Sequence, residues 1–145
     1  MIRIGLLGAS RVSRYAVIEP AGVVEGVRVS SVAARDPARA AVFARENEIP
    51  NVEADYEALV TSDAVDLVYN GLPPSSHARW TIAALAAGKH VLCEKPFAMN
   101  AGEAQAMVDA AERSGNLLIE AYHYRFHPLF ARVLEATNPG RIGAV

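Results

Sequence analysis

The sequence predicts an open α/β domain in which helices cover both faces of a parallel sheet. Two observations support this expectation. Short apolar runs alternate with longer amphipathic segments along the whole chain, and no repeat or low-complexity tract interrupts them. The apolar runs are also continuous rather than alternating, which is typical of strands buried on both faces. Because crossover connections between parallel strands are right-handed, the pattern favours a doubly wound sheet.

Composition narrows the class of protein further. The chain has 145 residues, of which 52% are apolar and 21% are charged. A chain of this length buries roughly 68–70% of its unfolded surface, so we expect one domain with a full core. A net charge of −2, with both signs interspersed, excludes nucleic acid and membrane surfaces as partners. One cysteine excludes an internal disulfide, and no zinc-site spacing occurs, so we expect no metal. Without a secretory or membrane segment, the expected location is cytoplasmic.

Five short apolar runs are predicted to be strands, since β-branched and large aliphatic residues dominate them. They are Ile2 to Leu7, Val27 to Ala33, Val65 to Asn70, His90 to Cys93 and Leu117 to Ala121.

Helix boundaries are marked by residues that cap helix ends. Asp36 stands directly before Pro37 and is expected to cap a helix that begins there. Asn100 and Glu103 form a capping-box pattern, and Gly115 is expected to end that helix. The core-facing stripe of this helix is expected to consist of Ala104, Met107, Val108 and Ala111.

The last part of the chain predicts a helix from about Pro128 to Ala136, followed by a turn. The apolar run from Ile142 to Val145 then resembles a strand that is cut short. We therefore expect the chain to be a fragment of a longer protein.

The first strand runs into a turn of small residues, Gly8-Ala9-Ser10-Arg11-Val12-Ser13. In a doubly wound sheet, this turn and the following helix N-terminus hold the pyrophosphate of a dinucleotide. Of the G-x-G-x-x-G pattern only Gly8 matches, because Ser10 and Ser13 occupy the other glycine positions. The alternative is an ordinary turn of small residues.

The end of the second strand normally selects between NAD and NADP. Here it reads Ala34-Arg35-Asp36-Pro37, with Arg39 one turn later. Because Asp36 is expected to cap the helix, Arg35 is free to pair with the 2′-phosphate of NADP. The prediction is therefore NADP, with NAD as a possible cofactor. The alternative is that Arg35 is one of 12 solvated arginines.

A buried strand ends in Glu94-Lys95-Pro96 at the edge where open α/β sheets bind their ligands. Lys95 is one of only two lysines in the chain. A lysine amine can act as an acid or base near a cofactor, whereas arginine keeps its proton. Lys95 is therefore the candidate for chemistry, and the alternative is a surface ion pair between Glu94 and Lys95.

Five segments carry a resemblance to a known family. They are Gly8-Ala9-Ser10-Arg11, Ala34-Arg35-Asp36, Leu72-Pro73-Pro74-Ser75-Ser76-His77, the run from Gly88 to Pro96, and Tyr124-Arg125-Phe126-His127-Pro128. The chain resembles, over its whole length, the N-terminal domain of the glucose-fructose oxidoreductase, inositol dehydrogenase and rhizopine-catabolism (Gfo/Idh/MocA) family. The last segment resembles the branch that contains trans-dihydrodiol and NADP-dependent xylose dehydrogenases.

This resemblance implies a Rossmann domain over residues 1–137. Residues 138–145 would begin a second, α+β substrate domain that is absent from the chain. The resemblance places Lys95 beside the nicotinamide and the substrate hydroxyl as the catalytic residue, and it places Leu72, Pro73 and His77 near the cofactor. The expected cofactor-binding residues are Gly8, Ser10, Arg11, Val12, Ala34, Arg35, Arg39, Leu72, Pro73, His77, Glu94 and Lys95.

The predicted function is transfer of hydride between NADP and a hydroxyl-bearing carbon of a sugar, polyol or cyclic diol. Two alternatives stay open. One is a non-catalytic dinucleotide-binding sensor or interaction domain, because fold does not determine function. The other is a coenzyme A binding domain, which Arg35 and Glu94-Lys95-Pro96 disfavour. We also expect a homo-oligomer, since a surface made to meet a second domain would be apolar.

Overall fold

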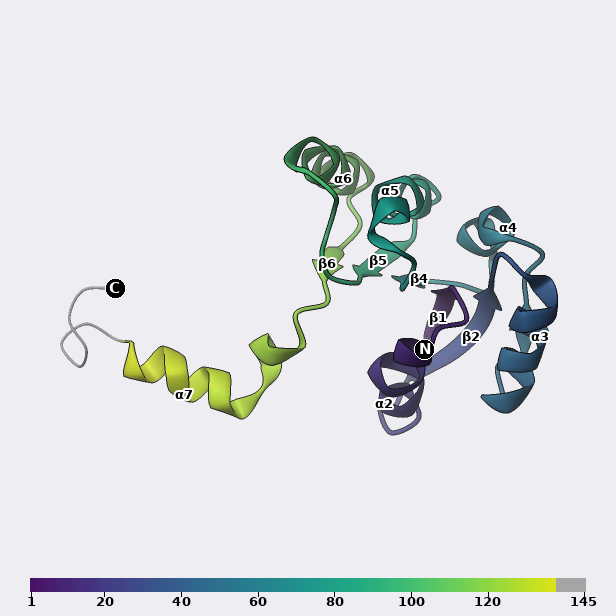
Figure 1. The fold of residues 1–145 in the computed structure, drawn as a ribbon, viewed down its shortest axis with the longest axis horizontal. Coiled ribbons are helices and arrows are strands. Elements are labelled where there is room, and N and C mark those ends of the chain that lie inside the picture. Colours follow the sequence, from purple (N-terminus) through teal and green to yellow (C-terminus); the bar gives the residue numbers. More distant parts are fainter. Residues whose placement is uncertain (138–145) are drawn as a thin grey trace.

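Six parallel strands form the sheet, in the order β3-β2-β1-β4-β5-β6 (Figure 1). The structure is a computed structural model that describes residues 1–137. The strands are β1 (Ile2–Leu7), β2 (Val27–Ala33), β3 (Asn51–Val52), β4 (Leu67–Asn70), β5 (His90–Cys93) and β6 (Leu118–Glu120). The predicted doubly wound sheet is confirmed. The sequence missed β3, and it set the limits of β4 and β6 slightly too wide.

The chain reverses its direction of travel across the sheet at β1. It first adds β2 and β3 on one side of β1, and then returns to place β4 on the other side. In open α/β sheets the ligand crevice lies at this switch point, outside the carboxyl ends of the strands. The loops after β1 and β4 therefore define where a ligand is expected.

Helices cover the two faces of the sheet. The helical segments within residues 1–137, not all of which touch the sheet, are α1 (Arg11–Ser13), the π-helical η1 (Arg14–Ile18), α2 (Glu19–Ala21), α3 (Pro37–Glu46), α4 (Tyr56–Thr61), η2 (Pro74–Ser76), α5 (His77–Ala86), α6 (Ala101–Ser114), η3 (His123–Phe126) and α7 (Pro128–Ala136). In Figure 1, α4, α5 and α6 lie on one side of the strands and α2 on the other.

The core is divided between these two faces. Successive strand residues point to opposite faces, so Leu7 packs under α4 to α6 while Leu6 packs against α2 and α3. Both leucines are fully buried. This two-sided burial is why apolar residues dominate most of the strands, although β2 also contains Arg28, Ser30 and Ser31.

The predicted helix caps are largely confirmed. Asp36 accepts backbone N–H groups of α3, and Gly115 ends α6 with a φ of +69°. Asn100 caps α6, but the capping box is incomplete, because the Glu103 carboxylate accepts the N–H of Met99 rather than that of Asn100. The predicted stripe of α6 was wrong in one residue, since Val108 is exposed and Ala110 is buried in its place.

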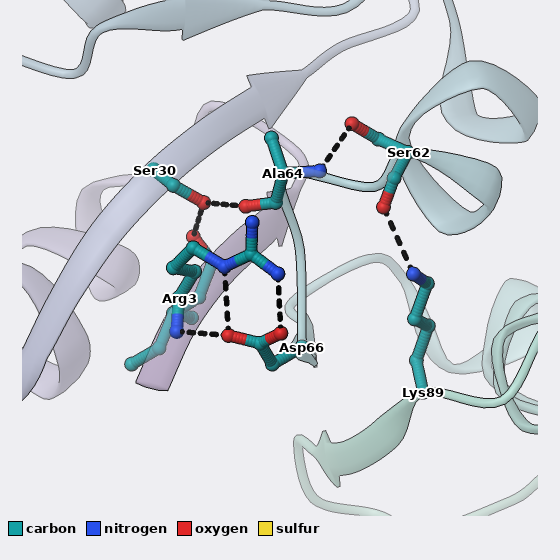
Figure 2. Close-up of polar contacts among 7 residues, drawn as sticks. Arg3, Ser30, Ser62, Ala64, Asp66 and Lys89 are labelled. Atoms are coloured by element: carbon teal, nitrogen blue, oxygen red, sulfur yellow. Dashed lines mark hydrogen bonds and ion pairs between the residues drawn. The ribbon is translucent and has the colours of Figure 1, made fainter. Parts of the chain in front are cut away.

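A polar network joins the amino-terminal ends of the strands, away from the ligand edge (Figure 2). The Arg3 guanidinium donates to both Asp66 oxygens, at 2.9 and 2.6 Å, and the Arg3 N–H donates at 2.8 Å. The hydrogen bonds from Arg3 lower the pKa of Asp66 to about 2. Lys89 Nζ donates to the Ser62 carbonyl at 2.9 Å, which ties the start of β5 to the loop before β4.

We expect Asp66→Asn to lower the free energy of unfolding at pH 7 by about 1 kcal/mol, because the pair with Arg3 is partly exposed. The folded-state pKa of Asp66 is depressed, so its stabilisation is present above pH 4 and is lost as pH falls towards about 2. Urea unfolding at several pH values measures this. A difference between variant and wild type that stays constant down to pH 2 would contradict the assignment.

The segment after β6 leaves the sheet and carries α7 away from it (Figure 1). α7 has the predicted bounds, and its apolar residues Leu129, Val133 and Leu134 are exposed. The predicted strand from Ile142 to Val145 lies outside the described residues. No helix within residues 1–137 has the length and apolar character needed to cross a membrane.

Candidate cofactor and active site

The turn after β1 lies against the loop after β4. Gly8 has a φ of +95°, a conformation that a side chain disfavours, and a Cβ at this position would lie 3.2 Å from Leu72 Cδ2. The Gly8 N–H donates to the Ala33 carbonyl at 2.8 Å, which fixes the turn to the end of β2. The glycine is therefore required by the backbone and by the approach of Leu72.

The two serines in the other glycine positions contact each other. Ser10 caps the helix, because its Oγ accepts the Ser13 N–H at 3.2 Å and lies 2.8 Å from Ser13 Oγ. Ser13 is fully buried, so its small side chain lets the helix pack closely on the sheet. α1, η1 and α2 then follow one another without a gap from Arg11 to Ala21. Val12, in the first turn of this helix, is half-buried.

Arg35 follows the end of β2 and Arg39 lies in the first turn of α3, and the two arginines have different surroundings. Arg35 is exposed, and its backbone N–H donates to Tyr56 Oη at 3.1 Å. Arg39 Nη2 donates to the Ala9 carbonyl at 2.8 Å, which joins α3 to the first turn. Ala34, directly before Arg35, is buried. Within residues 1–137, the Arg39 guanidinium has a hydrogen-bond partner, whereas only the backbone of Arg35 has one.

A groove of about 820 Å³ runs beside the first turn, between the first helix and α3. Its lining includes three arginines and two carboxylates, namely Arg11, Arg14, Arg39, Asp36 and Glu46. Arg14 is paired with Glu19 at 3.3 Å. Arg11 and Arg39 form no ion pair within residues 1–137, so their guanidinium groups are available to an anionic ligand that reaches from the first turn towards α3.

A buried histidine holds the loop after β4 through its ring nitrogens. His77 is fully buried at the start of α5, with Nε2 2.7 Å from the Leu72 carbonyl oxygen and Nδ1 2.9 Å from that of Pro96. The ring therefore links the loop after β4 to the loop after β5. Leu72 is buried and Pro73 is exposed, so the loop offers Pro73 rather than His77 to a ligand.

Asn70 supports the same loop and was missed by sequence reasoning. Its side chain is fully buried and donates to the His77 carbonyl and to Thr81 Oγ1, both at 3.1 Å. A polar residue that ends a buried strand needs such partners, which is the feature that could have identified it.

Glu94 and Lys95 leave the end of β5 in different environments. Glu94 is buried, accepts the hydroxyl proton of Tyr69 at 2.8 Å and accepts the Lys95 N–H at 3.1 Å. His123 Nε2 lies 3.8 Å from the same carboxylate. Lys95 is exposed, and its peptide bond to Pro96 is cis. Within residues 1–137, no ion pair joins the Glu94 and Lys95 side chains.

Tyr69 was also missed by sequence reasoning. It lies in β4 with 1% of its surface exposed, and burial together with the Glu94 carboxylate raises the pKa of its hydroxyl. A buried tyrosine in an aliphatic strand needs a partner for its hydroxyl, and that partner lies on the neighbouring strand. Tyr69 therefore holds Glu94, and through it the backbone of Lys95.

Cys93, directly before Glu94, is fully buried, and burial raises the pKa of its thiol to about 11. Cys93 packs within the core on the α4 to α6 side of the sheet. Among the described residues, no cluster of three or more potential metal ligands occurs.

The topology, the glycine turn at the switch point and the arginines after β2 define a class of protein, the open α/β domains that bind dinucleotides at the carboxyl edge of the sheet. The model of the oxidoreductase family Gfo/Idh/MocA, described as having an NAD-binding Rossmann fold, matches residues 2–122. The chain belongs to this family.

Characterised relatives extend the comparison. The chain is 43% identical over 141 residues to D-xylose 1-dehydrogenase (NADP(+)) 2 of Haloferax volcanii, and 36% identical over 145 residues to trans-1,2-dihydrobenzene-1,2-diol dehydrogenase of Danio rerio. These matches cover 97% and 99% of the chain. The chain spans 43% of the length of each relative.

A solved structure shows the same arrangement. The 3-ketoreductase KijD10 of Actinomadura kijaniata, in an open conformation with TDP-benzene and NADP, is 34% identical and superposes with a TM-score of 0.88. The match covers 98% of this chain and 45% of the KijD10 chain.

Proposed function

We propose that this chain binds NADP along the carboxyl edge of its sheet, as the cofactor-binding part of an oxidoreductase that acts on a hydroxyl-bearing carbon of a sugar, polyol or cyclic diol. The observation that carries the proposal is the placement of the Gly8 turn, Arg35 and Lys95 at the ends of three strands on one edge. The named activities and ligands of the relatives support the same conclusion.

The residues present fit a dinucleotide. Gly8 places no side chain between a phosphate and the backbone. At the start of the following helix the Ser13 N–H is accepted by Ser10 Oγ, while the first N–H groups lack an intrahelical acceptor and can meet an anion. Ser10, Arg11 and Val12 would hold the pyrophosphate end, while Arg35 and Arg39 would receive the 2′-phosphate beside Ala34. Leu72 and Pro73 would border the middle of the cofactor, with His77 holding their loop.

NADP, when bound, supplies the acceptor for a hydride. Lys95 would lie at the nicotinamide end, where its amine accepts or orients the proton of the substrate hydroxyl. Glu94 would act on the Lys95 backbone rather than on the substrate, because its carboxylate is already engaged by Tyr69. In this proposal the residues of this chain bind the cofactor and move one proton. The contact with Tyr69 also keeps the Glu94 carboxylate from pairing with the Lys95 amine.

We propose that the rest of the substrate site, together with a second acid or base, belongs to a further domain of the whole enzyme. We also propose that the whole enzyme is a homo-oligomer, a proposal supported by the exposed apolar residues of α7.

Calorimetric titration of the chain with NADPH, NADH and coenzyme A tests the proposal. We expect NADPH to bind more tightly than NADH, and coenzyme A not to bind. Saturable coenzyme A binding without NADPH binding would overturn the proposal. A sensor would bind NADPH equally well, so turnover by the whole enzyme on a panel of sugars and diols separates it from an oxidoreductase.

We expect Arg35→Ala to weaken NADPH binding roughly tenfold or more and to leave NADH binding nearly unchanged, because a charge-assisted contact contributes ~1.5–3 kcal/mol. Arg28→Ala is the matched control, since Arg28 is exposed at the opposite end of β2. Equal losses for both cofactors would remove Arg35 from the 2′-phosphate site.

A further inference from the structure

We infer that Tyr56 sets the preference for NADP over NAD by holding the backbone from which Arg35 extends. This inference rests on the proposed function, and it assigns to Tyr56 a positioning role that neither the motifs nor the resemblance indicated. Tyr56 begins α4, 21 residues beyond Arg35, and its Oη accepts the Arg35 N–H at 3.1 Å.

The contact is placed where the backbone needs support. On one side of Arg35 the chain is held by buried Ala34, and on the other by Asp36, which caps α3. Arg35 itself is exposed, and its side chain makes no hydrogen bond or ion pair within residues 1–137. The hydrogen bond to Tyr56 therefore fixes the backbone of Arg35, whose guanidinium has no other polar contact in the described residues to orient it towards a phosphate.

The Tyr56 ring is held rigidly enough to perform this role. It packs edge-on against Trp80 of α5, with ring centroids 5.2 Å apart and an interplanar angle of 75°. The Arg79 guanidinium covers the Trp80 ring at 4.7 Å. Both aromatic rings pack against the core beneath α4 and α5. Packing of the Tyr56 ring against Trp80 and the core thus holds its hydroxyl at the edge of the sheet.

The expected effect is selective, because NADP and NAD differ only in the 2′-phosphate. Without the hydrogen bond to Tyr56, Arg35 would have to become ordered when it binds this phosphate. That loss of conformational entropy weakens the binding of NADPH and not of NADH. A general loosening of the domain would weaken both cofactors. The ratio of the two affinities therefore distinguishes positioning of Arg35 from a merely structural role.

The test is Tyr56→Phe, which removes the hydroxyl and keeps the ring against Trp80. We expect the dissociation constant for NADPH to rise about twofold to tenfold, as for the loss of one hydrogen bond, while that for NADH stays unchanged. In the Arg35→Ala background the same substitution should have no further effect on NADPH binding. Tyr124→Phe is the matched control, because the Tyr124 ring packs on Phe130, away from Arg35.

The outcomes separate this inference from the proposed function. If the wild-type chain binds both cofactors equally, the NADP assignment falls and the role of Tyr56 falls with it. If Arg35→Ala abolishes the preference and Tyr56→Phe retains it, only the role of Tyr56 is overturned. Equal weakening of NADPH and NADH by Tyr56→Phe also overturns it. If that variant does not fold, Trp80→Phe, which loosens the ring and retains the hydroxyl, has to show the same selective loss.

Discussion

Lys95→Met is expected to lower kcat of the whole enzyme by about 10²–10⁴-fold, the usual contribution of a general acid or base. The affinity for NADPH should change little, because the phosphate contacts lie at the Gly8 turn and at Arg35. The loss should therefore appear in kcat and in kcat/KM to a similar extent. Steady-state kinetics over a panel of sugars and diols, with NADPH binding measured separately, provides the comparison.

The chain offers a matched control in its other lysine. Lys89 is half-buried, donates to the Ser62 carbonyl, and lies at the opposite end of β5 from Lys95. Lys89→Met should lower the stability of the domain and leave kcat unchanged at a temperature where both proteins are folded. If Lys95→Met also retains a normal kcat, Lys95 has no part in the reaction.

The 145-residue chain alone is expected to bind NADPH without turning over any sugar or diol. All the residues proposed to hold the cofactor lie within it, but Lys95 is exposed to water. Without a further domain the substrate would not be positioned beside the nicotinamide, and the effective-molarity contribution of ~7–11 kcal/mol is largely lost. Binding and catalysis should therefore separate in this chain.

Calorimetry with NADPH followed by a turnover assay of the same sample measures both properties. Robust turnover by the chain alone would show that the substrate site is complete within it. Failure to bind NADPH at all would show that the cofactor site needs residues from elsewhere. Either result would contradict the proposed division of the enzyme.

Local features of the sequence were sufficient for much of the fold. The limits of β1, β2 and β5 follow from runs rich in β-branched and aliphatic residues, and the start of α3 follows from Asp36 and Pro37, because these features act between near neighbours. β3 could not be found in this way, since two residues carry no periodicity and its pairing with β2 defines it. The π-helical η1 was also missed; it ends at Ile18, two residues before Pro20, which has no N–H to continue an α-helical ladder.

The candidate site was predictable to the level of individual loops, but not of the contacts beneath them. Arg35 and Lys95 could be placed at strand ends, because parallel strands end at a common edge. The partner of Glu94 could not be predicted, because Tyr69 lies 25 residues away and contacts it only through the pairing of β4 with β5. For the same reason the link made by His77 to Pro96 required the tertiary structure.

The different surroundings of the two lysines also determine which amine of this chain reacts with amine-directed reagents. The amine of Lys89 donates to a backbone carbonyl, whereas the exposed Lys95 makes no side-chain hydrogen bond within the described part of the chain. Apart from the N-terminus, an acylating or imine-forming reagent thus meets a single readily accessible nitrogen, which lies at the end of β5. A fluorophore or cross-linker attached there would report directly on what enters the crevice, without any engineered attachment site.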